Sequence, residues 1–171
     1  METKVTTPVV KGLIISLILI VFGLVLYFTD QYMNKTLSYI QYAIILGGII
    51  WGCTTYSNQL NNNVTFGNLF AHGFKITAVF TVILVVYTIL SLKVLFPEMA
   101  DKILEQTTAE LEKQNMSEEQ IDQAMSITKK FFVPFAIGGV LVGYMFIGAI
   151  SSLLGAAIAK KNPQDPFVQQ G

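Results

Sequence analysis

Charge is scarce in this chain, and arginine is absent. Only 13% of the 171 residues are charged and 53% are hydrophobic, whereas a soluble domain carries about 25% charged residues. The formal net charge is zero, so the composition indicates no nucleic acid or other partner of bulk opposite charge. All cationic residues are lysines, which excludes the bidentate clamps that arginine forms on phosphate or carboxylate groups. This shortage of charge is typical of a membrane protein.

Side chains that carry chemistry are also few. A single cysteine, Cys53, excludes an intramolecular disulfide and a thiolate metal cage, and a single histidine, His72, excludes a multi-histidine metal site within one chain. No aspartate or glutamate falls within the four long apolar segments, where proton-coupled carriers usually hold ionisable groups. No phosphate-binding loop, nucleophile elbow or zinc-protease motif occurs. We therefore expect no enzyme activity, cofactor or metal.

The apolar segments predict an all-α integral membrane bundle of four transmembrane helices, forming a single membrane domain over residues 1–171. A span needs about 20 apolar residues. The first run follows Lys11, is longer than the core of a signal peptide and precedes no suitable cleavage site, so we expect an uncleaved span. The tail, residues 162–171, is expected to be disordered. The predicted spans are about residues 9–29, 37–56, 76–96 and 131–159.

A charged insert, residues 97–130, separates the third and fourth predicted spans. It holds 12 of the 22 formal charges. Its sequence predicts a helical hairpin that turns at Asn115 and Met116, with Ser117 capping the second helix and Gln120 completing a capping box. We expect this insert to dock on a protein partner or to pack against a second copy in a homo-oligomer.

Glycines recur at four-residue spacing in the second and fourth spans. Gly48 and Gly52 form one such pair, and Gly139 and Gly143 form another. Small residues let helix backbones approach closely in lipid, where packing replaces the hydrophobic effect. These four glycines are therefore candidates for packing the second span against the fourth, an interpretation that we favour over a dimer face.

Polar residues near and within the third span have two interpretations each. Thr77, Thr81 and Thr88 recur on one side of the span. Hydroxyls at this spacing usually bond to helix backbone, but they leave open a polar path for solutes. His72 lies in an aromatic, amphipathic segment before the span. It is either a proton acceptor or ligand, or a wet imidazole at the membrane interface, and the lack of a nearby acidic residue favours the second interpretation.

The order of these features resembles a known family. Over roughly residues 8–161 the chain is similar to domain of unknown function 4199, a bacterial family of small inner-membrane proteins. The resemblance implies an inner-membrane location and brings no catalytic residue or ligand with it. The segments that carry it are Thr65-Phe66-Gly67-Asn68-Leu69-Phe70, Gly73-Phe74-Lys75, the exit at Pro97, Ser117-Glu118-Glu119-Gln120 in the acidic insert, and the final Lys160-Lys161.

These patterns predict a non-enzymatic interaction or structural component of the membrane, with the lipid bilayer as its first partner. The alternative is a small carrier or channel that uses the hydroxyl side of the third span. Four spans place both termini on one side, together with five lysines and two acids, whereas the other side has six lysines and nine acids. Lys4 and Lys11 lie at the leading side of the first span, and only Lys35 lies close beyond its other end. The positive-inside rule therefore predicts cytoplasmic termini.

Overall fold

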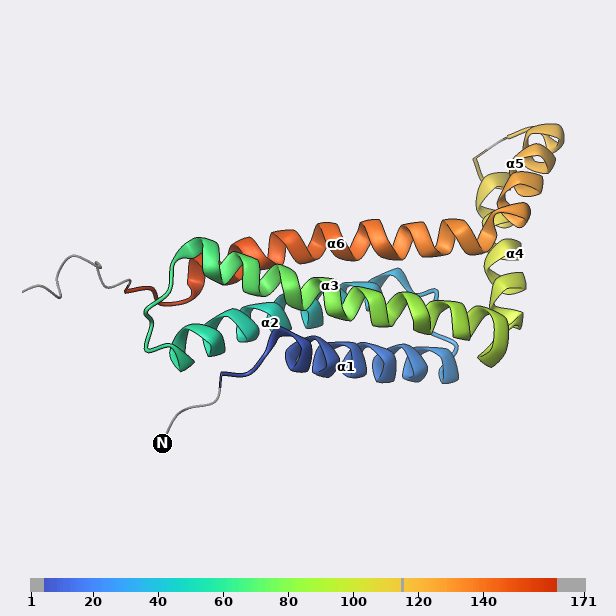
Figure 1. Ribbon diagram of the computed structural model, residues 1–171. Helices are drawn as coiled ribbons and strands as arrows, with labels where there is room; N and C mark the ends of the chain where they lie inside the picture. Colours follow the sequence, from blue (N-terminus) through green and yellow to red (C-terminus); the bar gives the residue numbers. More distant parts are fainter. Residues whose placement is uncertain (1–4, 115, 163–171) are drawn as a thin grey trace, which may run out of the picture. The chain divides into compact units, whose positions relative to one another are not determined.

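The computed structural model describes residues 5–114 and 116–162, and all its regular elements are helices (Figure 1). The predicted all-α class is confirmed for these residues. Asn115 of the predicted turn and residues 163–171 of the predicted tail lie outside them. The elements are α1 (Pro8–Phe28), α2 (Lys35–Gln59), α3 (Phe66–Leu90), a π-helical turn η1 (Ser91–Leu95), α4 (Glu98–Glu112), α5 (Glu118–Lys130) and α6 (Phe132–Ile158).

Four helices in the described ranges are long and apolar enough to cross a membrane, namely Pro8–Phe28, Lys35–Gln59, Phe66–Leu95 and Phe132–Ile158. The chain is accordingly a membrane protein with its candidate spans in the predicted order. The third candidate span begins at Phe66 rather than near Ile76, so the segment expected at the interface is the first part of α3. The hydroxyl of Thr65 accepts from the Asn68 amide at 3.2 Å, which caps this earlier start.

The described residues form two compact units. The first comprises the residues up to Ile83 and those from Gly143 onward, and the second comprises Leu84–Val142. The first unit contains α1, α2, most of α3 and the later part of α6. The second contains the end of α3, η1, α4, α5 and the beginning of α6.

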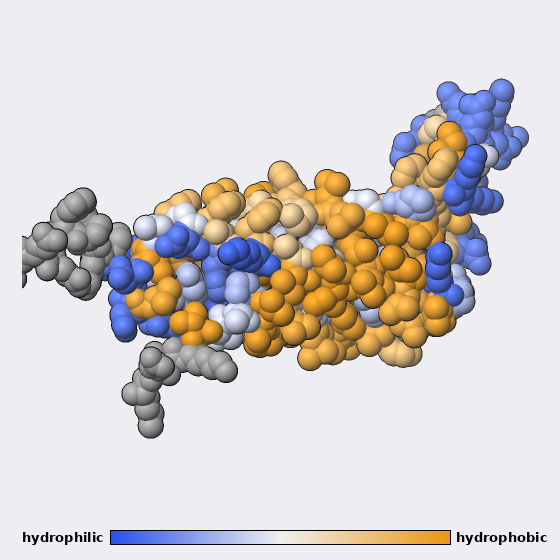
Figure 2. Space-filling model, viewed as in Figure 1, coloured by the Kyte–Doolittle hydropathy of each residue, from blue (hydrophilic) through white to orange (hydrophobic). Residues whose placement is uncertain are grey.

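Helices of the first unit approach each other at small residues. α1 packs against α2 where Ile15 covers Gly48, and against α3 where Val79 covers Gly12. α6 packs against α3 where Thr77 covers Gly148, and against α2 where Cys53 covers Gly155. Apolar side chains cover much of the visible face of these helices (Figure 2), as lipid contact requires. The buried apolar residues of this unit include Ile15, Leu19, Ile45, Ile49, Cys53, Leu69, Ile76, Phe80 and Ala156.

The second unit contains α4 and α5, which contact each other and carry most of the charged residues of this unit (Figure 2). The predicted capping box of α5 is confirmed: the Gln120 amide donates to Ser117 Oγ at 3.4 Å, and the Ser117 amide donates to Gln120 Oε1 at 3.1 Å. Ile121 and Met125 are buried, one helical turn apart on α5. These two residues give the otherwise charged helix one apolar side.

Candidate functional site

A lysine is completely buried in the first unit. Lys11 lies in the first turns of α1, which begins after the N-cap residue Thr7 and has Pro8 at its first position. The side chain of Lys11 is 0% exposed. Its ammonium nitrogen lies 2.9 Å from the carbonyl oxygen of Gly52 and 3.2 Å from Nε2 of His72. Lys11 therefore joins α1 to α2 and α3 through polar contacts inside an apolar core.

Gly52 leaves the space through which Lys11 reaches across the bundle. A Cβ at this position would lie 2.5 Å from Ile76 Cδ1 and 3.7 Å from the Cδ atom of Lys11. A larger residue would push Ile76 away and narrow the path of the lysine side chain. Gly52, which was predicted to pack the second span against the fourth, instead allows side chains of α1 and α3 to pack against α2.

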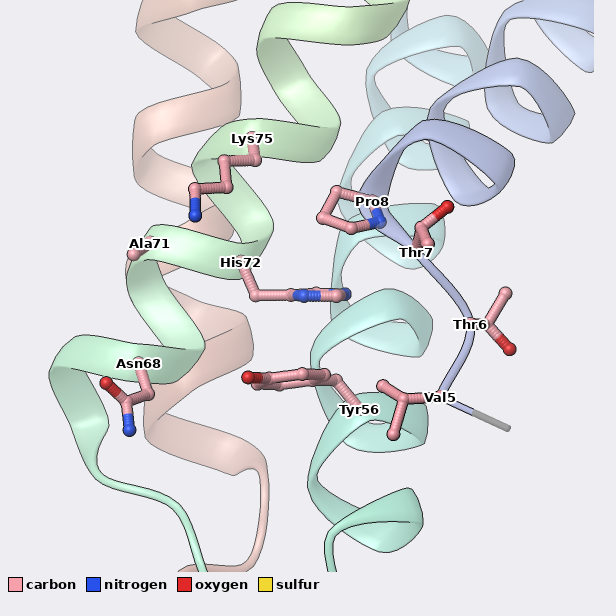
Figure 3. Close-up of a pocket in the computed structure, with 9 residues that line it drawn as sticks. All are labelled: Val5, Thr6, Thr7, Pro8, Tyr56, Asn68, Ala71, His72 and Lys75. Carbon is pink, nitrogen blue, oxygen red and sulfur yellow. The ribbon is translucent and has the colours of Figure 1, made fainter. Parts of the chain in front are cut away.

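His72 is held between Lys11 and an aromatic ring. It is 5% exposed, and its imidazole stacks on the ring of Tyr56 with centroids 3.9 Å apart and planes 12° from parallel (Figure 3). Lys11 Nζ lies 5.8 Å from the centroid of the same tyrosine ring. An ammonium group has only donors, so it donates to Nε2 and leaves the imidazole proton on Nδ1. Lys11 thereby makes His72 a donor through Nδ1.

Among the described residues of the first unit, no carboxylate contacts Lys11 to balance its charge. Asp30, just after the far end of α1, is the sole acidic side chain among the described residues of this unit. At about 1.5 Å per residue it lies roughly 28 Å from Lys11 along the chain. A buried cation without a counter-charge is costly, and an ionisable residue inside a membrane span is by default a candidate functional residue.

A cavity of about 390 Å³ adjoins this cluster. One water molecule occupies about 30 Å³ in the liquid, so the cavity has room for a ligand larger than water. His72 is common to the cavity and to the Lys11 cluster. Asn68, His72 and Lys75 stand on successive turns of α3 and present one amide, one imidazole and one ammonium (Figure 3). The lining residues are Val5, Thr6, Thr7, Pro8, Asn68, Ala71, His72, Lys75 and Tyr56.

The segment before α1 is fixed at the mouth of this cavity by Gln59 near the end of α2. The backbone amide of Thr6 donates to Gln59 Oε1 at 2.9 Å, and Gln59 Nε2 donates to the Thr6 hydroxyl at 2.8 Å. Because the glutamine uses both ends of its amide, the segment is held in register. Residues that precede the first apolar run in sequence are thereby brought to the wall of the cavity.

The end of α6 lies at the same end of the bundle. The hydroxyl of Ser57 donates to the Lys160 carbonyl, and the Asn162 amide donates to the Asn62 carbonyl at 2.7 Å. Lys161 Nζ lies 2.6, 3.1 and 3.0 Å from the carbonyl oxygens of Ala156, Ala157 and Ala159, and so neutralises the negative end of α6. The described residues of this unit place no acidic side chain beside the positive ends of α1 and α3.

The candidate glycines of the sequence analysis lie in different surroundings. Gly48 faces Ile15 of α1, and Gly52 faces Ile76 of α3. A Cβ added at Gly139 or Gly143 would meet no atom of the described residues within 4 Å. Contacts between α2 and α6 occur at other residues: Gly155 faces Cys53, and Gln41 Nε2 donates to the hydroxyl of Tyr144.

The candidate polar path has two satisfied hydroxyls and one unsatisfied one. Thr77 donates to the Gly73 carbonyl at 3.1 Å, and Thr88 donates to the Leu84 carbonyl at 2.8 Å, so both bond to their own helix. Thr81 is 1% exposed, and its hydroxyl has no hydrogen-bond partner in the described part of the chain. The described residues also contain no group of three side chains that could hold a metal ion.

Sequence reasoning missed the contact of Lys11 with His72 and was wrong about the exposure of His72. Lys11 was interpreted as a charge on the leading side of the first span. His72 was interpreted as a wet imidazole because no acidic residue lies nearby in sequence. In the structure the two side chains contact each other across 61 residues. A usable signal was present: Lys11 follows Val9 and Val10 and directly precedes an apolar run, so its side chain falls inside the span.

An all-helical fold with four candidate spans and a buried lysine–histidine contact defines a small polytopic membrane protein. The chain belongs to the family described as Protein of unknown function (DUF4199), whose model matches residues 11–161. The match covers the candidate spans except for the first three residues of α1, and it begins at Lys11. Among curated proteins none matches the chain, and none of the solved structures does.

Proposed function

We propose that this protein is a non-enzymatic membrane component that binds an anionic ligand in the cavity beside His72. This cavity, whose lining residues are given above, is named the lysine–histidine cavity. The observation that carries this proposal is the complete burial of Lys11, for which the described residues of its unit supply no acidic side chain except distant Asp30. The positive ends of α1 and α3 adjoin the same cavity, and helix N-termini favour anions. An anion in the cavity would supply the missing counter-charge.

Thermal unfolding of the purified protein in an uncharged detergent tests this proposal. Added inorganic phosphate should raise the unfolding midpoint above that in sodium chloride of equal ionic strength, because a ligand that binds only the folded state stabilises it. His72→Gln and Lys75→Gln should lose this increase. Lys160→Gln removes an exposed lysine from the same end of the bundle and should retain it. An equal response in all four proteins would refute the proposal.

A small carrier or channel is the second candidate function, and the unsatisfied hydroxyl of Thr81 favours it. A buried hydroxyl without a partner is costly, and a passing solute or water would satisfy it. Flux of an anion through vesicles that contain the protein would support this function if Thr81→Val abolished it. The carrier would be rejected if flux were absent, or if it were unchanged in the Thr81→Val variant.

The insert, residues 97–130, is proposed to be a helical hairpin that docks on a partner or on a second copy. Contact between α4 and α5 supports the hairpin, and Ile127, which is 54% exposed on α5, supplies an apolar contact point. In a Cys53→Ser background, Ile127→Cys should form a disulfide between copies in the membrane. A monomer after oxidation would exclude the second copy as the occupant of this surface.

We further propose that the protein resides in the inner, or plasma, membrane with both termini in the cytoplasm. The charge difference between the two sides supports this orientation. In it, the lysine–histidine cavity faces the cytoplasmic leaflet, whose surface is enriched in anionic lipid. The charged insert then faces the periplasm or exterior.

A further inference from the structure

We infer that the ligand of the lysine–histidine cavity is a phosphate monoester group, carried by a lipid or free in solution. This inference rests on the proposed function, because it names the chemical class of the anion that the cavity binds. Four observations support it, and they concern charge, hydrogen-bond donors, the type of cation and the lining of the cavity.

The charge of the site matches an anion with more than one negative charge. Lys11 and Lys75 bring two ammonium groups to the cluster and the cavity, and no acidic side chain among the described residues of the first unit except distant Asp30 offsets them. A phosphate monoester carries a charge of about −1.5 to −2 at neutral pH. A carboxylate or a phosphodiester, with one charge, would leave part of this excess uncompensated.

The donors of the site match a group with several acceptor oxygens. Asn68, His72 and Lys75 follow each other at spacings of four and three residues, so they share one face of α3. Nδ1 of His72 forms no hydrogen bond within the described residues, although the side chain is 5% exposed. Lys11 occupies Nε2, so the remaining Nδ1–H is available to a ligand. The three terminal oxygens of a phosphate monoester can accept from all three side chains.

The type of cation is compatible with phosphate. Lysine binds phosphate as a point charge, and all the cationic residues of this chain are lysines. The start of α1 adds a further favourable feature, since a helix N-terminus attracts phosphate, and its residues Thr7 and Pro8 line the cavity.

The lining of the cavity suits a group that is attached to a lipid. Val5, Pro8, Ala71 and the ring of Tyr56 supply apolar surface beside the polar donors. The cavity lies where α1 and α3 begin, which is at the end of two candidate spans. A lipid head group at this depth would place its phosphate near Lys75 and its glycerol against the apolar residues. Free phosphate would use the same donors without the apolar contacts.

Ligand-dependent thermal unfolding of the full-length protein distinguishes these sources. One arm compares inorganic phosphate with acetate and chloride, at equal ionic strength, for protein in uncharged detergent. The other arm compares phosphatidylcholine vesicles that contain a minor fraction of phosphatidate, phosphatidylglycerol or phosphatidylserine. The wild-type protein alone gives the ligand preference, and Lys75→Gln and Lys160→Gln serve as the test and control variants in both arms.

We expect inorganic phosphate and phosphatidate to stabilise the protein. The other anions of each arm should bind with at least tenfold lower apparent affinity. Lys75→Gln, but not Lys160→Gln, should lose about tenfold in apparent affinity for phosphate. Stabilisation only in the vesicle arm, or only by inorganic phosphate, supports the phosphate class and identifies its source. Equal stabilisation by acetate, phosphatidylserine or phosphatidylglycerol would overturn the phosphate monoester while retaining the proposed function. No stabilisation by any anion would overturn both.

Discussion

At the scale of single residues, Lys11 shows how a polar contact inside a span depends on its neighbours. The lysine reaches His72 because Gly52 leaves its path open, and Tyr56 holds the imidazole parallel to its own ring. None of these residues is polar enough to stabilise a buried cation as a carboxylate would. We interpret this arrangement as preparation for a ligand, since a purely structural contact would be served better by apolar residues.

Replacing Lys11 by methionine separates the two roles. Methionine fills a similar volume and removes the cost of burying a charge, while His72 Nε2 loses its donor, so the free energy of unfolding should change by no more than about 1 kcal/mol. The stabilisation by phosphate should disappear, because His72 loses the contact that fixes its tautomer. Thermal unfolding with and without phosphate measures both effects. A variant that fails to fold would instead show that Lys11 is a structural residue.

A second prediction concerns Gly148, where α6 approaches α3. A Cβ at this position would lie 2.8 Å from the Cβ of Thr77 and closer still to its Cγ2, so Gly148→Ala should destabilise the protein by about 1–3 kcal/mol. Gly143→Ala in the same helix is the matched control, because its Cβ would meet no described atom within 4 Å and alanine favours helix. Equal unfolding midpoints for the two variants would contradict the packing of α6 on α3.

At the scale of elements, the capping box of α5 should contribute measurably to that helix. Ser117→Ala removes the acceptor of the Gln120 amide and should cost about 1 kcal/mol of local stability. Hydrogen exchange of the α5 amides measures the loss. Ser126→Ala, an exposed position within the same helix, should leave protection unchanged or raise it, because alanine is the better helix former. Similar exchange in both variants would argue against the cap.

The helices themselves could be predicted because their signals are local. Apolar runs of sufficient length predicted the four candidate spans, and the spacing of Ser117 and Gln120 predicted the start of α5. The first turns of α3 were assigned to an interfacial segment before the span because they are amphipathic. In the fold, the same turns bury Leu69 and His72 against other helices. These turns belong to the third candidate span because they pack against other helices. Such tertiary contacts cannot be predicted from the sequence pattern alone.

The candidate site could not be predicted for the same reason. His72, Tyr56 and Lys11 are far apart in sequence, and each has an ordinary explanation when considered alone. Gly52 was predicted to be a helix-packing residue from the four-residue spacing of the glycines. That spacing does not say which neighbouring helix packs against it. The positions of the glycines were therefore informative, whereas their partners required the fold.

At the scale of the whole molecule, the orientation in the membrane is testable with a fusion after Gly171. A reporter enzyme that is active only in the periplasm should remain inactive there, because the terminal side carries the more positive net charge. The same reporter inserted within the insert, between α4 and α5, should be active and serves as the control. Burial of Lys11 removes one positive charge from the exposed surface on the side of the termini. The net charge of that side still exceeds that of the other side. Activity after Gly171 would invert the topology.

The proposed binding of an anion beside His72 can be tested directly, since the chain has a single histidine. Protein produced without a histidine tag and labelled with nitrogen-15 in histidine gives the two ring nitrogens of His72 alone. The structure predicts a neutral imidazole with its proton on Nδ1, and a shift of the Nδ1 signal when inorganic phosphate is added. A proton on Nε2 of the neutral ring, or a spectrum that does not respond to phosphate or phosphatidate, would contradict the proposed site.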